Sequence, residues 1–437
     1  MRRNLPILLV CLAALYYLAA GTYKASHFSR DLIPVYSGAR CLLHGCNPYD
    51  PAELEHQYLQ GGGAARLLGP GFWKGYTPVY PPSTFLVLLP LALFKFHVVR
   101  PIWALLSGGL FVTAAGVVLF RCPHGYRWAS AILVSFFLFA NVNISLLAEG
   151  NPTPFAIALL ILGTVFFLSN RYIPLATLLL MLSLAVKPQI GGLIALYLLA
   201  RKIHWRWVVL AMAGALMILL LAGLILRVHP RSHDWAPSLR ANIAESIQRG
   251  HVNDPGPDNP GAIGIVNLQT ITSIFFTDAK IFNAVAFGIF AALLAIWVTA
   301  ALRANSGPDG HYLLISALAV LSLLPFYHRS GDDMLLLLTV PTIVTLLGKC
   351  RALGIWAAVV TSLLCISEFS IRWRGQFVER HWGEVGILQH RFLFILLLRP
   401  QCLLLLLLFS LYLAAMYAGL AAADATATTE PSHAFLA

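Results

Sequence analysis

The sequence predicts an all-α polytopic membrane protein, and three observations support this fold class. Apolar residues make up 59% of the 437 positions and charged residues only 11%, whereas a soluble domain carries about 25% charged residues. Apolar runs of roughly 15–25 residues recur along the chain, near the length that a membrane-spanning helix needs. The net charge is +12, and the basic residues stand in short loops between the runs, which is typical of cytoplasmic loops and excludes a nucleic-acid-binding surface.

The first apolar run, from Leu5 to Tyr23, is predicted to be a span. Arg2 and Arg3 precede it, as in a signal peptide, but no small-residue cleavage site follows an apolar region of ordinary length. The N-terminus is therefore expected to stay in the cytoplasm.

A long polar loop follows at residues 24–82 and is expected on the extracytoplasmic side. Apolar residues between Leu32 and Leu43 recur there at nearly helical spacing, which indicates a short amphipathic helix lying at the membrane interface. Gly45 and Pro48 are expected to end this helix.

The remaining spans are predicted from apolar runs between polar turns. They lie at about 83–97, 101–120, 128–147, 152–169, 172–186, 188–200, 206–227, 280–301, 311–327, 333–348, 352–370 and 391–418. A second large extracytoplasmic loop is predicted at 228–279, and 421–437 is expected to be a disordered tail. The chain is thus predicted to form one domain, 1–420, with about 12 spans and a range of about 11–13.

Orientation rests on Lys and Arg in short loops. The basic segment 201–206 and the pair Lys349 and Arg351 mark the cytoplasmic side. Counting every run as a full span gives the wrong parity. Either 172–200 is one long helix, or one apolar stretch between 83 and 147 does not cross fully. The first alternative is preferred because it keeps both long loops outside, although it leaves Arg121 and Arg127 outside as well.

Asp31 is conspicuous because it is a lone carboxylate just outside the first span. A helix N-cap explains it adequately. The two roles are compatible, because the dipole at a helix N-terminus keeps a carboxylate ionised, and an ionised carboxylate facing a cleft accepts a proton from an attacking hydroxyl. We therefore interpret Asp31 as a candidate general base.

Basic residues near the membrane are candidate phosphate ligands. Lys187 precedes Pro188 at a helix break, where a lysine is expected to be paired or to face a polar cavity; snorkelling to the headgroups is the alternative. His328 and Arg329 link two spans and suit a phosphate. Asp332 or Asp333 is expected to cap the next helix.

The cysteines show no metal-binding spacing. Five of them stand in or beside apolar runs and are expected in the core. Cys41 and Cys46 share the first loop and leave a disulfide open, although helical spacing fits one poorly. No nucleotide-binding or zinc motif occurs, and no Asp-x-Asp pair stands in the first loop. We expect neither a metal nor a cofactor.

Several short motifs together resemble glycosyltransferase family 87, whose members carry the DUF2029 domain and include polyprenol-phosphate-mannose-dependent mannosyltransferases. The resemblance covers roughly residues 25–345. It rests on Asp31, Tyr36, Ala39, Gly45-Cys46-Asn47-Pro48-Tyr49-Asp50, Tyr80-Pro81-Pro82, Gly150-Asn151, Lys187-Pro188, Asn267-Leu268-Gln269-Thr270 and His328. The family's Gly-Gln-x-Asn turn lacks its glutamine here, and its Asn-Gln-Ser element is altered.

The resemblance implies a GT-C fold in the inner membrane with its active site on the extracytoplasmic face. It implies an inverting transfer of mannose or another sugar from a polyprenyl-phosphate donor to a glycolipid or glycan acceptor, with Asp31 as the base. Lys187, His328 and Arg329 are expected to bind the donor phosphate. The expected substrate-binding residues are Tyr36, Asn47, Tyr49, Tyr80, Asn151, Gln189, Asn267 and Gln269. A lipid or solute transporter is the alternative, although no internal repeat is visible, and a lipid-binding scaffold is a third.

Overall fold

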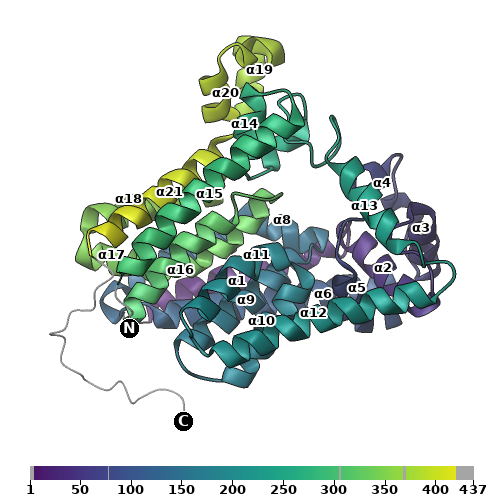
Figure 1. Ribbon diagram of the computed structural model, residues 1–437, viewed down its shortest axis with the longest axis horizontal. Helices are drawn as coiled ribbons and strands as arrows, with labels where there is room; N and C mark the ends of the chain where they lie inside the picture. Colours follow the sequence, from purple (N-terminus) through teal and green to yellow (C-terminus); the bar gives the residue numbers. More distant parts are fainter. Residues whose placement is uncertain (1–3, 77, 305–306, 368–370, 420–437) are drawn as a thin grey trace.

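The computed structural model describes residues 4–76, 78–304, 307–367 and 371–419. Within these residues the chain is helical, apart from its loops and one isolated bridge between Ile265 and Arg329. The predicted tail at 421–437 and the Arg2–Arg3 signal lie outside them. Figure 1 shows a bundle of helices, with α19 and α20 projecting from it beside α14.

Six helices in the described residues are long and apolar enough to cross a membrane, by length and composition. They are α1 (Leu5–Ala25), α6 (Phe96–Arg121), α12 (Trp205–Val228), α15 (Ala279–Arg303), η5 continued by α17 (Ser330–Lys349) and α21 (Pro400–Tyr417). A seventh arises if α7 (Arg127–Phe139) and α8 (Asn141–Glu149), which meet at 44°, form one broken span. The described residues thus form an all-helical structure with six or seven candidate spans, which is consistent with a polytopic membrane protein, and this count is below the predicted number.

Five further apolar helices are shorter. They are α9 (Thr153–Leu168), α10 (Ile173–Val186), α11 (Pro188–Ala200), α16 (Pro308–Ser322) and α18 (Arg351–Ser367). α9 lies deep in the bundle and packs against α6 and α10.

The preferred alternative of one continuous helix over 172–200 is wrong. Lys187 leaves the helical conformation, with φ −142° and ψ 78°, because Pro188 cannot continue the hydrogen-bond ladder. Lys187 lies beside Thr153 at the start of α9. At the other end of α9, Phe166 contacts Tyr172 and Phe167 contacts His204, with ring centroids 5.5 and 5.9 Å apart. α10 and α11 therefore both run along α9, and the chain reverses direction at Lys187.

The predicted span at 83–97 is also wrong. This stretch forms α5 (Pro82–Val87) and the 3₁₀-helix η2 (Leu89–Leu93), and a six-residue helix is only about 9 Å long. Ser83 and Thr84 donate hydrogen bonds of 2.6 and 2.9 Å to the carbonyls of Ala185 and Val186. α5 thus caps the C-terminal end of α10 instead of crossing.

The predicted span at 391–418 is divided at Arg399. α20 (Arg391–Leu398) ends there and α21 begins at Pro400. The buried Arg399 guanidinium donates to the backbone carbonyls of Ala262 and Gly256 at 2.5 and 3.1 Å. α19 (Ile371–Leu388) and α20 share a small apolar cluster with Ile274 of α14 (Gln269–Phe275).

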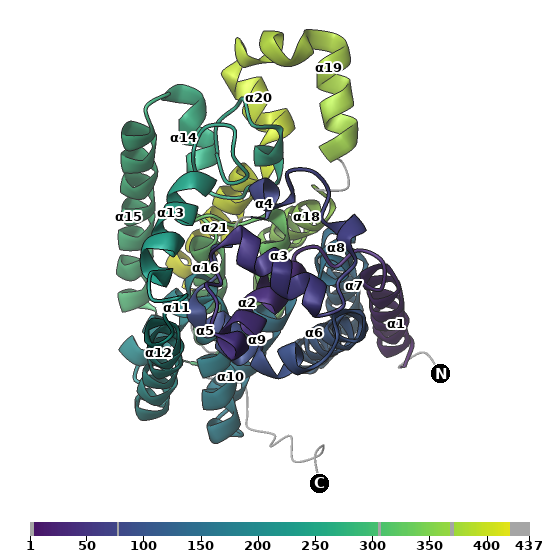
Figure 2. The ribbon, with the colours of Figure 1, turned by 90° about the vertical axis from the view of Figure 1, so that its right-hand side faces the viewer.

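The predicted helix after the first span is present as α2 (Leu32–His44), ended by Gly45 in the left-handed conformation with φ +70°. The other short helices of the two long loops are α3 (Pro51–Gln60), η1 (Ala65–Leu67), α4 (Phe72–Gly75), α13 (Trp235–Ser246) and η4 (Pro260–Gly264); η3 (His124–Tyr126) precedes α7. In Figure 2, α2 to α5 lie together beside α6 and α9.

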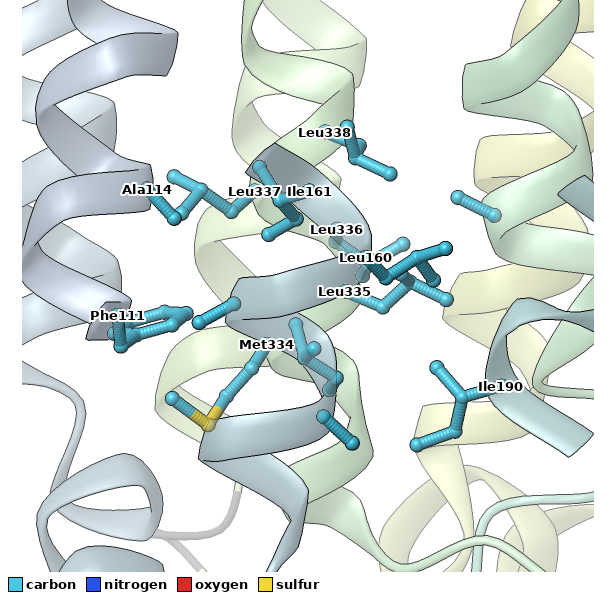
Figure 3. Close-up of a cluster of buried hydrophobic side chains, with 14 of the residues drawn as sticks. Phe111, Ala114, Leu160, Ile161, Ile190, Met334, Leu335, Leu336, Leu337 and Leu338 are labelled. Atoms are coloured by element: carbon cyan, nitrogen blue, oxygen red, sulfur yellow. The ribbon is translucent and has the colours of Figure 1, made fainter. Parts of the chain in front are cut away.

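The centre of the apolar core is the segment from Met334 to Leu338 in η5, whose side chains are at most 1% exposed. Figure 3 shows this segment among Phe111 of α6, Leu160 of α9 and Ile190 of α11. The polar residues that precede this segment, 328–333, are thereby held at one end of the bundle.

Candidate active site

Asp31 does not cap α2, so the predicted capping role is wrong. Its side chain makes no hydrogen bond to the helix N-terminus. Instead Asn151 Nδ2 donates to Asp31 Oδ2 at 2.7 Å. Asp31 as a residue is partly exposed, and the bond to Asn151 directs its carboxylate away from its own helix, towards the turn between α8 and α9.

The turn that carries Asn151 is held in place by contacts of Gly150, on one side, and of Thr153, on the other. Gly150 ends α8 with φ +72°, and a Cβ on it would lie 2.7 Å from Leu32 Cβ, so glycine permits this close approach to α2. Trp103 Nε1 donates to the Gly150 carbonyl at 2.9 Å, and Thr153 N donates to Asn151 Oδ1 at 2.9 Å. This last bond sets the amide orientation, leaving Nδ2 to face Asp31.

Backbone contacts join the same two segments. Ser29 N donates to the Ala148 carbonyl at 3.1 Å, and Arg30 N donates to Glu149 Oε2 at 3.2 Å. The start of α2 and the end of α8 are thus held together by at least three hydrogen bonds between residues far apart in sequence.

Asp332 lies at the start of η5 and collects donors from three parts of the chain. Its Oδ1 accepts from Thr153 Oγ1 at 2.9 Å and from Lys187 Nζ at 3.2 Å. Its Oδ2 accepts from Arg329 N at 3.3 Å and contacts His328 Nδ1 at 2.8 Å. The bond from Arg329 N confirms the predicted capping role for Asp332.

Lys187 is paired, as expected for a lysine at a helix break. Its ammonium forms an ion pair with Asp332 and a hydrogen bond to Thr153 Oγ1. The two charged side chains are only 12% and 6% exposed, so headgroup snorkelling does not describe this residue. An ammonium has three N–H groups, and one remains after these two contacts.

His328 and Arg329 flank this pair. His328 is fully buried, and its Nε2 has no hydrogen-bond partner within the described part of the chain. Arg329 bonds to the Tyr327 hydroxyl through Nε, to the Val252 carbonyl at 3.2 Å through a terminal nitrogen, and lies over the Tyr327 ring.

The charges around Asp31 oppose one another. Burial raises the pKa of Asp31, whereas the Asn151 hydrogen bond and the charges of Arg329 and Lys187 lower it, and the net shift is upward. Burial also raises the pKa of Tyr76 to about 12, with the negative charges of Asp31 and Glu149 adding to the effect. The pKa of Tyr80 is raised further, again by burial and by the negative charge of Asp31. Asp31 therefore interacts electrostatically with two neutral tyrosines, Tyr76 and Tyr80, and with the charges of Arg329 and Lys187.

Most of the other predicted substrate-binding residues bond to the protein itself. Tyr36 is buried and donates to the Phe94 carbonyl at 2.8 Å. Gln189 is exposed. Asn267 Oδ1 accepts from Thr270 N at 3.1 Å, and Gln269 donates to the Pro325 carbonyl at 3.0 Å. Hydrogen bonds through Thr153 and Asp332 thus join Asp31, Asn151, Lys187, His328 and Arg329 in one connected group. Tyr36, Asn267 and Gln269 bond to other parts of the chain.

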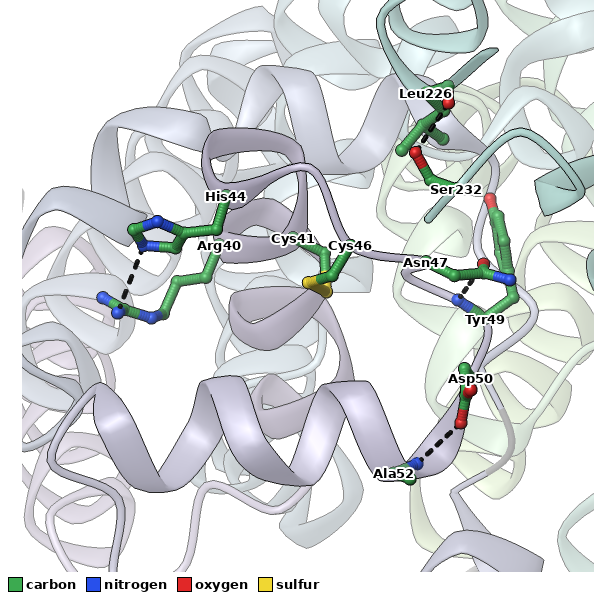
Figure 4. The surroundings of a disulfide bond; sticks show 10 residues. All are labelled: Arg40, Cys41, His44, Cys46, Asn47, Tyr49, Asp50, Ala52, Leu226 and Ser232. Atoms are coloured by element: carbon green, nitrogen blue, oxygen red, sulfur yellow. Dashed lines mark hydrogen bonds between the residues drawn. A yellow bond between two sulfur atoms is a disulfide. The ribbon is translucent and has the colours of Figure 1, made fainter. Parts of the chain in front are cut away.

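Within the first loop, a disulfide joins Cys41 near the end of α2 to Cys46, with Cα atoms 4.6 Å apart. The expectation that helical spacing disfavours this pair is wrong, because Gly45 ends α2 and turns the chain back, so that Cys46 N donates to the Cys41 carbonyl. Figure 4 shows Asn47 and Tyr49 just beyond it. Asn47 donates to Ser238 at 3.0 Å, and the Tyr49 hydroxyl donates to the Tyr80 carbonyl at 2.8 Å.

The role of Thr153 and the central position of Asp332 were not predicted. Thr153 follows Pro152 in an ordinary turn, and nothing in its local sequence indicates a buried contact to a residue 179 positions away. Asp332 carried only a capping signal. Within the described residues, no three His, Cys, Asp or Glu side chains form a group that could hold a metal ion.

Comparison with known proteins identifies the family. The model of glycosyltransferase family 87 matches residues 77–326, more than half of the chain. The match includes Asn151 and Lys187 and lies between Asp31 and His328. No curated protein matches the sequence. The chain therefore belongs to glycosyltransferase family 87.

Proposed function

We propose that this membrane glycosyltransferase transfers a hexose or pentose, such as mannose, from a polyprenyl-phosphate donor to a glycolipid or glycan acceptor, with Asp31 as the general base. The observation that carries the proposal is the placement of Asp31. Its carboxylate is held by an amide from another segment and is free of its own helix. A carboxylate with a raised pKa, on a partly exposed residue within the electrostatic reach of cationic side chains, suits proton removal in a transfer reaction.

The reaction proceeds as a single displacement. Asp31 takes the proton of the acceptor hydroxyl while the hydroxyl oxygen attacks the anomeric carbon from the side opposite the phosphate. The bond between that carbon and the phosphate oxygen breaks, its electron pair stays on the polyprenyl phosphate, and the configuration inverts.

Three side chains are proposed to bind the donor phosphate. Arg329 carries a full positive charge, Lys187 has one N–H left after Asp332 and Thr153, and His328 presents an unpartnered Nε2. Such donors stabilise the charge that grows on the leaving phosphate, and each is worth about 3 kcal/mol in comparable sites. Tyr80, near Asp31, is proposed to contact the sugar. Asn47, Tyr49, Asn267 and Gln269 support the loops of the site.

We further propose a GT-C arrangement of 12 spans for the single domain 1–420. The count of 12 assumes that the five shorter apolar helices and the bent pair also cross. With α5 and η2 outside, successive helices then cross the membrane in alternating directions from a cytoplasmic N-terminus. Asp31, Lys187 and Asp332 then share the extracytoplasmic face, with α2 at the interface. Arg121, Arg127, Arg201, Lys349 and Arg351 all fall in the cytoplasm, as the positive-inside rule requires. Helices of 13–17 residues require a locally thin bilayer.

The test is transfer by the purified protein in detergent, with a labelled polyprenyl-phosphate mannose and a lipid-linked mannoside as acceptor. Donor-dependent formation of a glycosidic product of inverted anomeric configuration supports the proposal. Retention of configuration contradicts the single displacement. Absence of transfer, together with donor movement across vesicles that contain the protein, favours the transporter alternative.

A further inference from the structure

Asp332 is buried at the start of η5, and its carboxylate is fully occupied by hydrogen-bonding neighbours. The residue is 4% exposed, and its carboxylate contacts four hydrogen-bonding groups from the start of α9, the α10–α11 break and the turn before η5. Two groups meet each oxygen, which matches the two lone pairs that each oxygen offers. Because no acceptor capacity remains, Asp332 neither removes a proton from substrate nor binds it directly.

We propose that Asp332 is a positioning residue for glycosyl transfer, which holds His328 so that Nε2 is the ring atom presented to the donor. This inference rests on the proposed function of the site. An ionised carboxylate only accepts hydrogen bonds, so the 2.8 Å contact with Asp332 requires a proton on His328 Nδ1. The opposite nitrogen, Nε2, is then the atom left for another partner.

The unpartnered Nε2 indicates what that partner is. His328 is fully buried, and Nε2 has no hydrogen bond within the described residues. A buried polar atom without a hydrogen-bond partner destabilises the folded protein, and a ligand that forms a hydrogen bond with it removes this penalty. A phosphodiester offers only acceptor oxygens, so it forms a hydrogen bond with Nε2 when this nitrogen carries a proton in addition to the one on Nδ1.

Asp332 is also connected to Asp31, the proposed base, through Thr153 and Asn151. Thr153 donates to Asp332 through its hydroxyl and to Asn151 Oδ1 through its backbone N–H, both at 2.9 Å. Asn151 in turn bonds to Asp31. The proposed base and the proposed phosphate ligand are thus positioned through one residue, Thr153, at the start of α9.

A double-mutant cycle on transfer tests the inference. Asp332→Asn can offer Nδ1 an N–H instead of an acceptor and so permits the wrong tautomer. We expect Asp332→Asn and His328→Gln each to lower kcat by about 100-fold or more, and the double variant to lie within about threefold of His328→Gln alone, because residues that act as a unit are not additive. Losses that multiply would show that Asp332 acts independently of His328 and would overturn the proposal.

Asp333→Asn is the matched control, because Asp333 is a neighbouring carboxylate that is equally buried, at 5% exposed against 4%. It is expected to leave kcat within about threefold of wild type when compared at equal folded fraction. A loss as large as that of Asp332→Asn would mean that any buried carboxylate at this helix start is required, contrary to the proposal.

A second readout does not depend on turnover. Nitrogen-15 NMR of histidine-labelled protein, with His328→Gln to identify the ring by difference, reports which nitrogen carries the proton. We expect a protonated Nδ1 in wild type and a mixture of tautomers in Asp332→Asn. An unprotonated Nδ1 in wild type would refute the positioning role, even if transfer occurs. A protonated Nδ1 in a protein that does not use polyprenyl-phosphate donors would refute the proposed function alone.

Discussion

Asn151 donates a 2.7 Å hydrogen bond to Asp31 from a position 120 residues further along the chain. Both ends of this contact are fixed: Asn151 by Thr153 N and by the left-handed Gly150, and Asp31 by the backbone bonds of Ser29 and Arg30 to the end of α8. The carboxylate therefore has one orientation imposed by the fold, as a general base requires.

Asn151→Ala removes this hydrogen bond while leaving Asp31 in place. Because a hydrogen bond to a charged group contributes about 1.5–3 kcal/mol, we expect kcat/KM for transfer to fall by about 10- to 100-fold. Asn283→Ala is the control, since Asn283 is partly exposed and its side chain donates to the Ala279 carbonyl within its own helix. Equal rates for Asn151→Ala and the control would exclude the orienting role.

The raised pKa of Asp31 predicts the pH dependence of transfer. Burial raises this pKa above the ordinary aspartate value, against the Asn151 bond and the two cations. Since the base must be ionised, kcat/KM should fall as the pH drops through this pKa, above the value of about 3.9 for a free aspartate. Asn151→Ala removes a pKa-lowering contact and should move the acid limb upward. A limb that does not move would assign the titration to another group.

The raised pKa of Asp31 also means that ionised Asp31 destabilises the folded protein, whereas a salt-bridged aspartate stabilises it. When the folded state has the higher pKa, it binds more protons than the unfolded state, so stability falls as the pH rises from the unfolded towards the folded pKa. Asp31→Asn should therefore unfold at a higher temperature than wild type at neutral pH, and the difference should vanish below about pH 4. Thermal unfolding of both proteins across this range measures the effect. A lower midpoint for Asp31→Asn at neutral pH would contradict it.

Lys187→Met should destabilise the protein strongly. It leaves the Asp332 carboxylate buried without its cation, and breaking a buried ion pair in this way costs about 3–5 kcal/mol. Adding Asp332→Asn to Lys187→Met should recover part of the loss, because the uncompensated charge is then absent. Unfolding midpoints of the three variants in one detergent provide the test, and strictly additive losses would show that the two charges are not coupled.

The Cys41–Cys46 disulfide reports on the side of the membrane. Disulfides persist in oxidising compartments. Because both cysteines are buried, the protein is denatured directly from intact cells before labelling, and we expect a maleimide to label this pair only after reduction. For so short a loop, the chain-entropy relation gives a stabilisation of about 2 kcal/mol. The Cys41→Ser, Cys46→Ser double variant should therefore have a free energy of unfolding lower by that amount. Labelling without a reductant would place the loop in a reducing environment and contradict the extracytoplasmic assignment.

The sequence predicted the helical class and most of the long helices, because these features are local, and it singled out several residues that the structure brings together in the candidate site. α12 and α15 lie within two residues of their predicted ranges, since continuous apolar runs define them. The division of 172–200 at Lys187 and of 391–418 at Arg399 also has a local cause in the following prolines, which hydropathy alone does not weigh.

Other features depend on tertiary contacts and were therefore not predictable. The stretch 83–97 is apolar enough to span, but Ser83 and Thr84 bond to the end of α10. Asp31 has a good N-cap signal, yet Asn151 provides a stronger partner from another segment. Asp332 looked like a helix cap, and its contacts with Thr153, Lys187 and His328 appear only when α9, α10 and η5 meet.

Transfer by Asp31→Asn tests the central claim most directly. The substitution keeps an oxygen that accepts from Asn151 but cannot take a proton, so we expect a folded protein whose kcat is about 100- to 10,000-fold lower than that of wild type. Asp50→Asn, at an exposed helix cap in the same loop, should retain its rate because asparagine caps equally well. A folded Asp31→Asn protein that transfers sugar at a rate within about threefold of wild type would contradict the assignment of Asp31 as the base.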